Sequence, residues 1–220
     1  MALRLNPSAN YLTLASAPSA PYTVVVNARF LADDYFCPVV FGDAEFGLAG
    51  GFNRLYINTS GGDVLGSTTI NLNQWYKFIW TWDGTTDQIY INNNLEISTT
   101  SYASRAFISL GRPLYTPNTE AIALDGLKIW SALLSASERD REIQSIKPVR
   151  QANLWAWLPN NTNGTQGREY GGNNRHFTVN GAPVDVAAAP VPWGGGVDIF
   201  PASSAPPVTD FASPLMLLAC

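Results

Sequence analysis

Two carboxylates in the stretch GDAEFG, Asp43 and Glu45, are the residues best spaced for catalysis. Side chains two positions apart share one face of a β-strand, and a retaining glycosidase holds its acid and nucleophile ~5–5.5 Å apart. The glycines on either side, Gly42 and Gly47, favour a turn over a strand here. The sequence contains no stretch in which three carboxylates are spaced as E-x-D-x-x-E. We therefore expect no catalysis by this pair and a protein that is not an enzyme.

The other side chains exclude several familiar catalytic centres. A single histidine, His176, rules out a metal site built on several imidazoles. A Ser-His-Asp triad remains formally open, but the sequence has no G-x-S-x-G motif, and it has no phosphate-binding or dinucleotide-binding glycine motif. We expect His176 to be a structural residue at the start of a strand.

Aromatic side chains in loops could bind sugars, since sugar binding needs exposed rings beside polar hydrogen-bonding groups. The loop aromatics are Tyr35, Phe36, Tyr102, Tyr115 and Tyr170. None of them clusters in the sequence, which is typical of scattered rim residues. Tyr102 and Tyr115 are the candidates for a weak glycan contact.

The stretch QWYKFIWTWDG, residues 74–84, looks at first like a larger sugar platform. Strand alternation puts four aromatic residues on one face, Tyr76, Phe78, Trp80 and Trp82. The opposite face carries Lys77, which cannot easily face a dry core. The aromatic face must then point inward, so this stretch is predicted to be a central strand of the core.

A turn-rich β domain must position these residues. Charged residues make up only 14% of the chain, against a typical ~25%. Short apolar runs separated by Gly, Pro, Asn and Asp predict strands, whose spacing favours antiparallel sheets over βαβ units. The predicted strands cover 22–30, 38–43, 46–58, 75–82, 88–92, 95–99, 106–111 and 153–159.

Two local signals are more specific. The asparagines of YINNNLEI, residues 90–97, tolerate the positive φ of a type I′ turn and predict a hairpin. In LLSASERDREIQSI, residues 133–146, Ser135 and Glu138 have the spacing of a capping box and predict a helix. Ile143 and Ile146 are expected to share the face that docks on the sheets.

Charge and apolar content exclude further classes. The net charge is −4 and no run of Lys or Arg exists, so nucleic-acid binding is not expected. No apolar run approaches ~18 residues, and Asn6, Pro7 and Asn10 interrupt the N-terminal region, so neither a membrane span nor a signal peptide is predicted. Of the two cysteines, Cys37 is expected to be a buried thiol, and Cys220 is terminal.

Three segments together resemble the laminin G-like domains of the concanavalin A-like lectin/glucanase superfamily: NQWYKFIWTWDGTTDQIYINNNLE, ALDGLKIWSALLSASERDREI and NLWAWLPNN…GGNNRHFTVNGAPV. The resemblance covers roughly residues 10–193, and the order of its pieces looks circularly shifted. It implies an all-β jelly-roll sandwich of two antiparallel sheets with one short helix, which we place in a domain at 1–193. Glu169 stands where the family usually has Asp. Similar variants occur in phage and bacterial proteins.

The resemblance also raises calcium, which such folds often hold on rim loops. Asp33, Asp34 and Asp43 are weak candidates, but no dense ligand loop is present, so no cofactor is expected. Asp83 and Asp125 match positions of the family and are interpreted as turn residues, since each precedes Gly.

Residues 194–220 are predicted to form an extended arm rich in Pro, Gly and Ala that ends in the apolar tip LMLLAC. Apolar tips usually dock on a partner. The docking residues would be Phe200, Phe211, Leu215, Met216, Leu217 and Leu218.

The arm, the lack of catalytic residues and the phage-like resemblance favour a structural protein of a phage virion. It would be a capsid decoration or tail-associated subunit, made in the host cytoplasm and placed on the virion surface. Its partners would be the major capsid or tail protein and copies of itself. The alternative is a glycan-binding, lectin-type adhesion module on a virion or bacterial surface.

Overall fold

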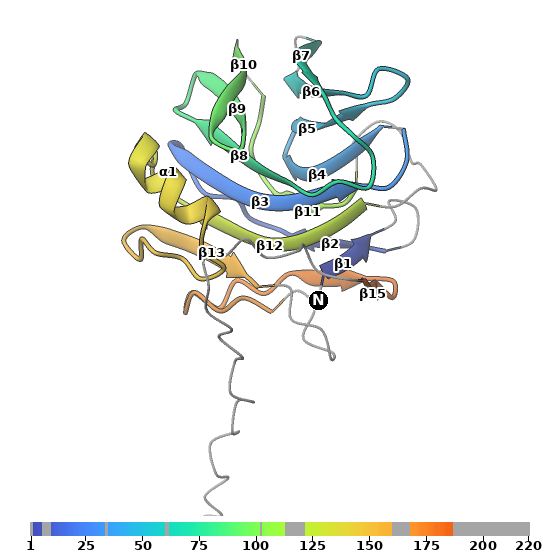
Figure 1. The fold of residues 1–220 in the computed structure, drawn as a ribbon. Coiled ribbons are helices and arrows are strands. Elements are labelled where there is room, and N and C mark those ends of the chain that lie inside the picture. Colours follow the sequence, from blue (N-terminus) through green and yellow to red (C-terminus); the bar gives the residue numbers. More distant parts are fainter. Residues whose placement is uncertain are drawn as a thin grey trace, which may run out of the picture.

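Two antiparallel β-sheets lie face to face, and helix α1 (Ala136–Ile143) lies against the outside of one of them (Figure 1). This confirms the predicted all-β jelly-roll sandwich with one short helix. The computed structural model describes residues 2–5, 10–33, 35–59, 62–101, 103–112, 122–159 and 168–186.

The first sheet has eight described strands, seven of them in the order β10-β9-β8-β3-β12-β1-β15, with β13 also pairing with β12. Its strands are β1 (Ala2–Leu5), β3 (Tyr22–Phe30), β8 (Tyr76–Trp82), β9 (Thr86–Ile91), β10 (Asn94–Thr100), β12 (Ile122–Trp130), β13 (Leu154–Leu158) and β15 (Val184–Val186). Strand β1 pairs with both β12 and β15, so Ala2 lies opposite Val186 at one edge of this sheet.

The second sheet has seven described strands in the order β14-β2-β11-β4-β5-β6-β7. They are β2 (Tyr11–Leu14), β4 (Phe36–Phe41), β5 (Ala44–Ala49), β6 (Arg54–Thr59), β7 (Asp63–Thr69), β11 (Ile108–Leu110) and β14 (Thr178–Asn180). The single strand predicted over 46–58 is wrong. It is a hairpin of β5 and β6, which turns through Gly51 and Asn53, both at positive φ.

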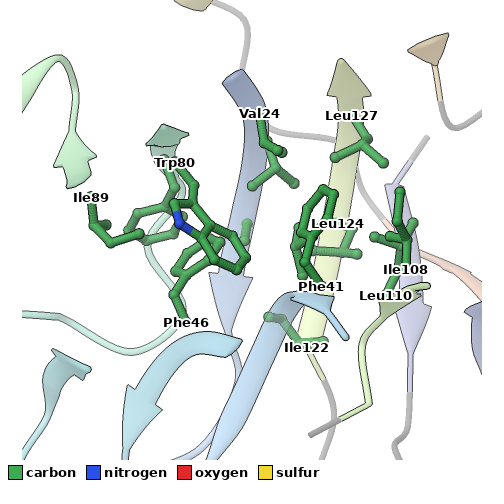
Figure 2. Close-up of a cluster of buried hydrophobic side chains, with 14 of the residues drawn as sticks. Val24, Phe41, Phe46, Trp80, Ile89, Ile108, Leu110, Ile122, Leu124 and Leu127 are labelled. Carbon is green, nitrogen blue, oxygen red and sulfur yellow. The ribbon is translucent and has the colours of Figure 1, made fainter. Parts of the chain in front are cut away.

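The inner faces of the two sheets share one hydrophobic core. Trp80 of β8 packs edge-on against Phe41 and Phe46 of the opposite sheet, at centroid distances of 5.2 and 5.5 Å (Figure 2). Tyr76 and Phe78 belong to the same core, and Trp82 packs against it. The aromatic row is therefore core, as predicted, and each such ring buries ~150–250 Å².

The two local signals also hold. Asn92 and Asn93 have φ values of 50° and 67° and turn β9 into β10. Ser135 caps α1, and the reciprocal bond from its backbone N–H to the Glu138 carboxylate completes the capping box. The prediction that Ile143 and Ile146 share the docking face of the helix is correct for Ile143 only. Ile143 is buried, but the helix ends there and Ile146 lies beyond it, 39% exposed.

Lys128 of β12 fixes the C-terminal end of the helix to the sheet. Its Nζ lies 2.9 Å from a carboxylate oxygen of Glu142 and donates to the carbonyl oxygens of Glu142 and Ser145 at 2.8 and 2.6 Å. A cation at a helix C-terminus is favourable because the last carbonyl groups carry partial negative charge. The other oxygen of Glu142 accepts from the backbone N–H groups of Val149 and Arg150 at 2.9 and 2.6 Å.

Candidate functional site

The outer faces of the two sheets differ in kind. Beneath α1, the eight-stranded sheet carries a second cluster of buried apolar side chains, Val25, Ile79, Tyr90, Trp130, Leu134, Ile143 and Leu154. The chain's own helix thus occupies this outer face. The outer face of the seven-stranded sheet carries polar side chains that could contact a ligand on every one of its strands except β4.

A single row of paired residues crosses that face, with one residue from each of the seven strands. In order from β14 to β7 they are Thr178, Thr13, Ser109, Val40, Glu45, Asn58 and Asp63. On six of the strands the neighbours of these residues point into the core, as Phe41 and Phe46 do, so alternation puts the row on the opposite face. Asp63 of β7 joins the row through its pairing with Asn58. Six of the seven side chains are polar, and we call this set the polar row.

Burial changes along the polar row. Its middle members, Ser109, Val40 and Glu45, are buried, whereas Thr178 and Asp63 at the two ends are exposed. Ser109 Oγ has no hydrogen-bond partner among the described residues. The ends are therefore where a ligand has direct access.

Glu45 is held by a short chain of hydrogen bonds. The hydroxyl of Tyr56 donates to its Oε1 at 2.8 Å, and Cys37 Sγ lies 3.0 Å from the same hydroxyl. Burial raises the pKa of both the Cys37 thiol and the Tyr56 phenol, and the Glu45 carboxylate adds to this. The thiol stays protonated, which agrees with the expected buried Cys37 and gives no nucleophile.

The suspected carboxylate pair is divided between two environments. Asp43 lies in the turn after Gly42, exposed, with its backbone N–H donating to the Ser104 carbonyl at 2.8 Å. Glu45 lies within β5, so the expected turn does not extend as far as Gly47. Asp43 is therefore exposed in a turn while Glu45 is buried on a strand, and the two carboxylates do not form a shared site.

The β2–β14 end of the polar row offers more than one kind of polar group. Tyr11 lies opposite Asn180 and Thr13 opposite Thr178 on paired strands. The amide of Asn180 donates to Thr13 Oγ1 at 3.2 Å. Arg112 stacks over the Tyr11 ring, 4.7 Å from its centroid, and donates to its hydroxyl at 3.2 Å. We call these five residues the Tyr11 corner. Sequence analysis did not predict this corner, because its members come from distant parts of the chain: Thr13 and Asn180 are 167 positions apart.

The weak calcium candidates are not brought together. Asp33 accepts a hydrogen bond from the backbone N–H of Gly51 at 3.0 Å, and Asp43 lies in the turn between β4 and β5. Asp34 lies outside the described residues. Across the part of the chain that the structure describes, no group of three or more His, Cys, Asp or Glu could hold a metal ion.

Several other candidates also lie outside the described residues. These are Tyr102, Tyr115 and the arm residues Phe200, Phe211, Leu215, Met216, Leu217 and Leu218. Among the described loop candidates, Phe36 was wrong: it is a fully buried core residue of β4. Tyr170 is 36% exposed and packs against Trp157, and Tyr35 packs edge-on against Tyr56.

Glu169 and His176 hold a loop in place. The Glu169 carboxylate accepts from the backbone N–H groups of Trp157, Gly171 and Asn173. The Glu169 N–H in turn donates to His176 Nδ1 at 3.1 Å, as expected for a structural histidine. This network uses the carboxylate for folding rather than for chemistry.

The two family aspartates differ. Asp83 is a turn residue, as predicted, and the backbone N–H groups of Thr86 and Thr85 lower its pKa. The turn predicted at Asp125 is wrong. It lies inside β12, where the pairing with β3 shifts between Leu124 and Leu127 and Gly126 takes a φ of 82°.

Comparison with known proteins supports this architecture. Residues 7–138 match the family model described as the concanavalin A-like lectin/glucanases superfamily. A search of curated proteins gave no match. Among the described residues, no helix is long and apolar enough to cross a membrane.

Solved structures share the fold at low identity. A Bacteroides ovatus ATCC 8483 protein, whose proposed role is carbohydrate binding, aligns with a TM-score of 0.64 and 13% identity, covering 85% of this chain and 62% of its own. The receptor binding domain of botulinum neurotoxin type G aligns with a TM-score of 0.50 and 17% identity, and the alignment covers 64% of this chain and 41% of that structure. The binding domain of Paraclostridial Mosquitocidal Protein 1 aligns with a TM-score of 0.50 and 16% identity, and the alignment covers 65% of this chain and 43% of that structure. The chain thus spans less than two thirds of each of these proteins.

Proposed function

The chain belongs to the concanavalin A-like lectin/glucanases superfamily, and from that premise we propose that it binds carbohydrate on the outer face of its seven-stranded sheet. The observation that carries the proposal is the polar row, in which six of seven paired positions are polar. The proposed carbohydrate-binding role of the Bacteroides ovatus protein, which shares the fold, supports it.

Within this face, we place the contact at the Tyr11 corner. Sugars present hydroxyl groups that both donate and accept, so they need side chains of both kinds. Thr13 and Thr178 supply hydroxyl groups, Asn180 an amide and Arg112 further N–H donors. The ring of Tyr11 adds an apolar body with a polar tip, which suits a surface that is partly apolar and partly wet.

The proposed activity is binding without bond cleavage. Glycoside hydrolysis in its usual form needs two carboxyl groups on either side of the scissile bond. On this face Glu45 is buried against Tyr56, and Asp63 is bonded to Asn58 across two neighbouring strands at 2.8 Å. A glycan that binds should therefore be recovered unchanged after incubation, and release of reducing ends would contradict this part of the proposal.

The test begins with an array of neutral and acidic glycans, followed by calorimetry on the best ligand. Thr178→Val should weaken binding ~2–10-fold, the equivalent of one neutral hydrogen bond. Thr100→Val is the matched control, because Thr100 is also exposed on a strand but belongs to the other sheet. An array that stays blank at high protein concentration would contradict carbohydrate binding.

The position of the site is tested separately. Equal affinities of wild type, Thr178→Val and Tyr11→Ala would contradict the Tyr11 corner while leaving carbohydrate binding intact. The next surface to examine would be a hollow of about 120 Å³ on the eight-stranded sheet. It is lined by Thr81, Asp83, Thr86, Gln88, Leu133, Leu134 and Arg139.

A virion role is a second proposal, favoured by the apolar tip LMLLAC of the arm. The arm lies outside the described residues, so this proposal rests on the sequence alone. It does not conflict with glycan binding, because a decoration subunit could also adhere to a surface glycan. Deleting residues 197–220 should abolish incorporation into particles, and incorporation at full copy number would contradict the arm as an anchor.

A further inference from the structure

A turn directly after β11 places Arg112 over the neighbouring strand β2. Gly111 follows β11 with a φ of 74°, and its N–H donates to the Pro38 carbonyl oxygen at 3.2 Å. A Cβ atom at Gly111 would lie only 2.6 Å from Leu5 Cβ of β1, so this position needs glycine for space as well as for its φ. Beyond the turn, the Arg112 guanidinium lies over the Tyr11 ring of β2.

The guanidinium of Arg112 keeps most of its hydrogen-bonding capacity. A guanidinium carries five N–H donors in a rigid, planar fork. Among the described residues, Arg112 donates one hydrogen bond from a side-chain nitrogen, to the Tyr11 hydroxyl at 3.2 Å. Because the side chain is exposed, its other N–H groups are accessible to a ligand. The stacking on Tyr11 holds the fork in one orientation while leaving these donors unused.

The charge of Arg112 is not neutralised by the contacts that hold the Tyr11 corner. Those contacts are made by hydroxyl groups, an amide and an aromatic ring. The carboxylates of the polar row are Glu45 and Asp63, which lie three and five strands away from Thr13 of β2. Neighbouring strands are ~4.8 Å apart, so the nearer carboxylate is roughly 14 Å from Thr13. That separation exceeds the ~8 Å screening length of physiological salt.

We propose that the glycan bound at the Tyr11 corner is acidic and that Arg112 binds its anionic group, an inference that rests on the proposed carbohydrate binding. The planar fork can donate two parallel N–H···O hydrogen bonds to a carboxylate or to a sulfate ester. Thr13, Thr178 and Asn180 then remain for the hydroxyl groups of the same sugar. Arg112 is thus the residue that distinguishes an acidic from a neutral glycan.

The first test compares three sugars of one backbone that differ at a single carbon, which carries a hydroxymethyl group, a carboxylate or a sulfate ester. In calorimetry at neutral pH, wild type should bind at least one acidic form about fivefold or more tightly than the neutral form. The order of the two acidic forms identifies which anionic group the site takes. Equal affinities for all three would contradict an acidic ligand and leave carbohydrate binding intact, whereas no binding to any sugar would count against the proposed function itself.

The second test changes the charge of Arg112. Arg112→Gln should lose the preference for the acidic sugar, Arg112→Lys should keep part of it as a charge without the fork, and Arg112→Glu should reverse it. Arg168→Gln is the matched control, because Arg168 is also exposed and lies over a tyrosine ring, 5.4 Å from the centroid of Tyr170. It should keep the wild-type preference.

The ratio of the two affinities separates recognition of charge from a purely structural role. Near-ultraviolet circular dichroism confirms that each variant is folded. If Arg112→Gln and Arg112→Glu weaken the neutral and the acidic sugar by the same factor, Arg112 only orders the corner and the proposal is wrong.

Discussion

The indole N–H of Trp80 donates to Oδ1 of Asp87 at 2.6 Å, and the other carboxylate oxygen lies 2.6 Å from Nη2 of Arg105. Asp87 is fully buried, and the Arg105 guanidinium lies over the Trp82 ring, 4.8 Å from its centroid. Burial raises the pKa of Asp87, while Arg105 and the Trp80 N–H oppose that rise. The aromatic row thus encloses an ion pair instead of ending in a purely apolar core.

Removing one partner of this pair should be costly. Asp87→Ala leaves Arg105 buried without its counter-charge, and we expect the free energy of unfolding to fall by ~3–5 kcal/mol. Urea denaturation at neutral pH measures this change. Combining Asp87→Ala with Arg105→Met should recover part of the loss, because no unpaired charge then remains. A cost below ~1 kcal/mol for Asp87→Ala would contradict the role of the pair.

Trp80 itself should be a stability residue and not a ligand contact. Trp80→Ala should lower the free energy of unfolding by ~3–5 kcal/mol, because the side chain is fully buried between the sheets. Trp80→Phe is the comparison variant, since it keeps an aromatic ring but loses part of the buried ring area and the N–H that bonds Asp87, and it should cost less than Trp80→Ala. A soluble, fully folded Trp80→Ala protein that had lost only glycan binding would overturn this assignment.

The helix anchor should respond to alkaline pH. Burial lowers the pKa of Lys128 from 10.5 to about 8, although Glu142 opposes this. Between pH 8 and 10.5 the unfolded chain binds a proton that the folded chain has released, so the stability contributed by this group rises with pH. Thermal unfolding of wild type should show this rise relative to Lys128→Met. Parallel pH profiles would contradict it.

Acid should weaken two surface contacts. Burial raises the pKa of Glu96, but hydrogen bonds from Thr68 and Ser67 together outweigh burial and lower it. At Glu138 the backbone N–H of Ser135 lowers the pKa against a smaller effect of burial. Both carboxyl groups have a lower pKa in the folded chain than the ordinary 4.5. Their contribution to stability is therefore fully present above pH 4.5 and is lost as the pH falls through the pKa of the folded state. Melting temperatures from pH 6 to 3 should fall less steeply for the double variant Glu96→Gln/Glu138→Gln. An unchanged slope would contradict these carboxylates as acid-sensitive contacts.

The sequence predicted features that depend on neighbouring residues. The positive-φ turn at Asn92 and Asn93, the capping box of α1 and the inward face of the aromatic row all follow from spacing within a few positions. Strand β7 was missed because its polar, glycine-containing sequence lacks the apolar signal of a buried strand. That strand is largely exposed at an edge, so packing did not select such residues there.

The candidate site depends on pairing between strands that are far apart in the sequence. The polar row exists only because seven strands pair in one register, from Thr13 near the start of the chain to Thr178 near the end of the described residues. A shift of one residue in any strand would turn its polar side chain toward the core. No local pattern in the sequence contains that register.

The pairing of Ala2 with Val186 has a practical consequence for handling the protein. The described residues begin in β1 and end in the edge strand β15, and β15 begins only four residues after Asn180 of the Tyr11 corner. A purification tag or biosensor linker that replaces the residues after Val186 would therefore lie close to the proposed glycan contact. Immobilisation through an engineered cysteine in the exposed turn at Thr85, between β8 and β9, would leave that corner facing the solution.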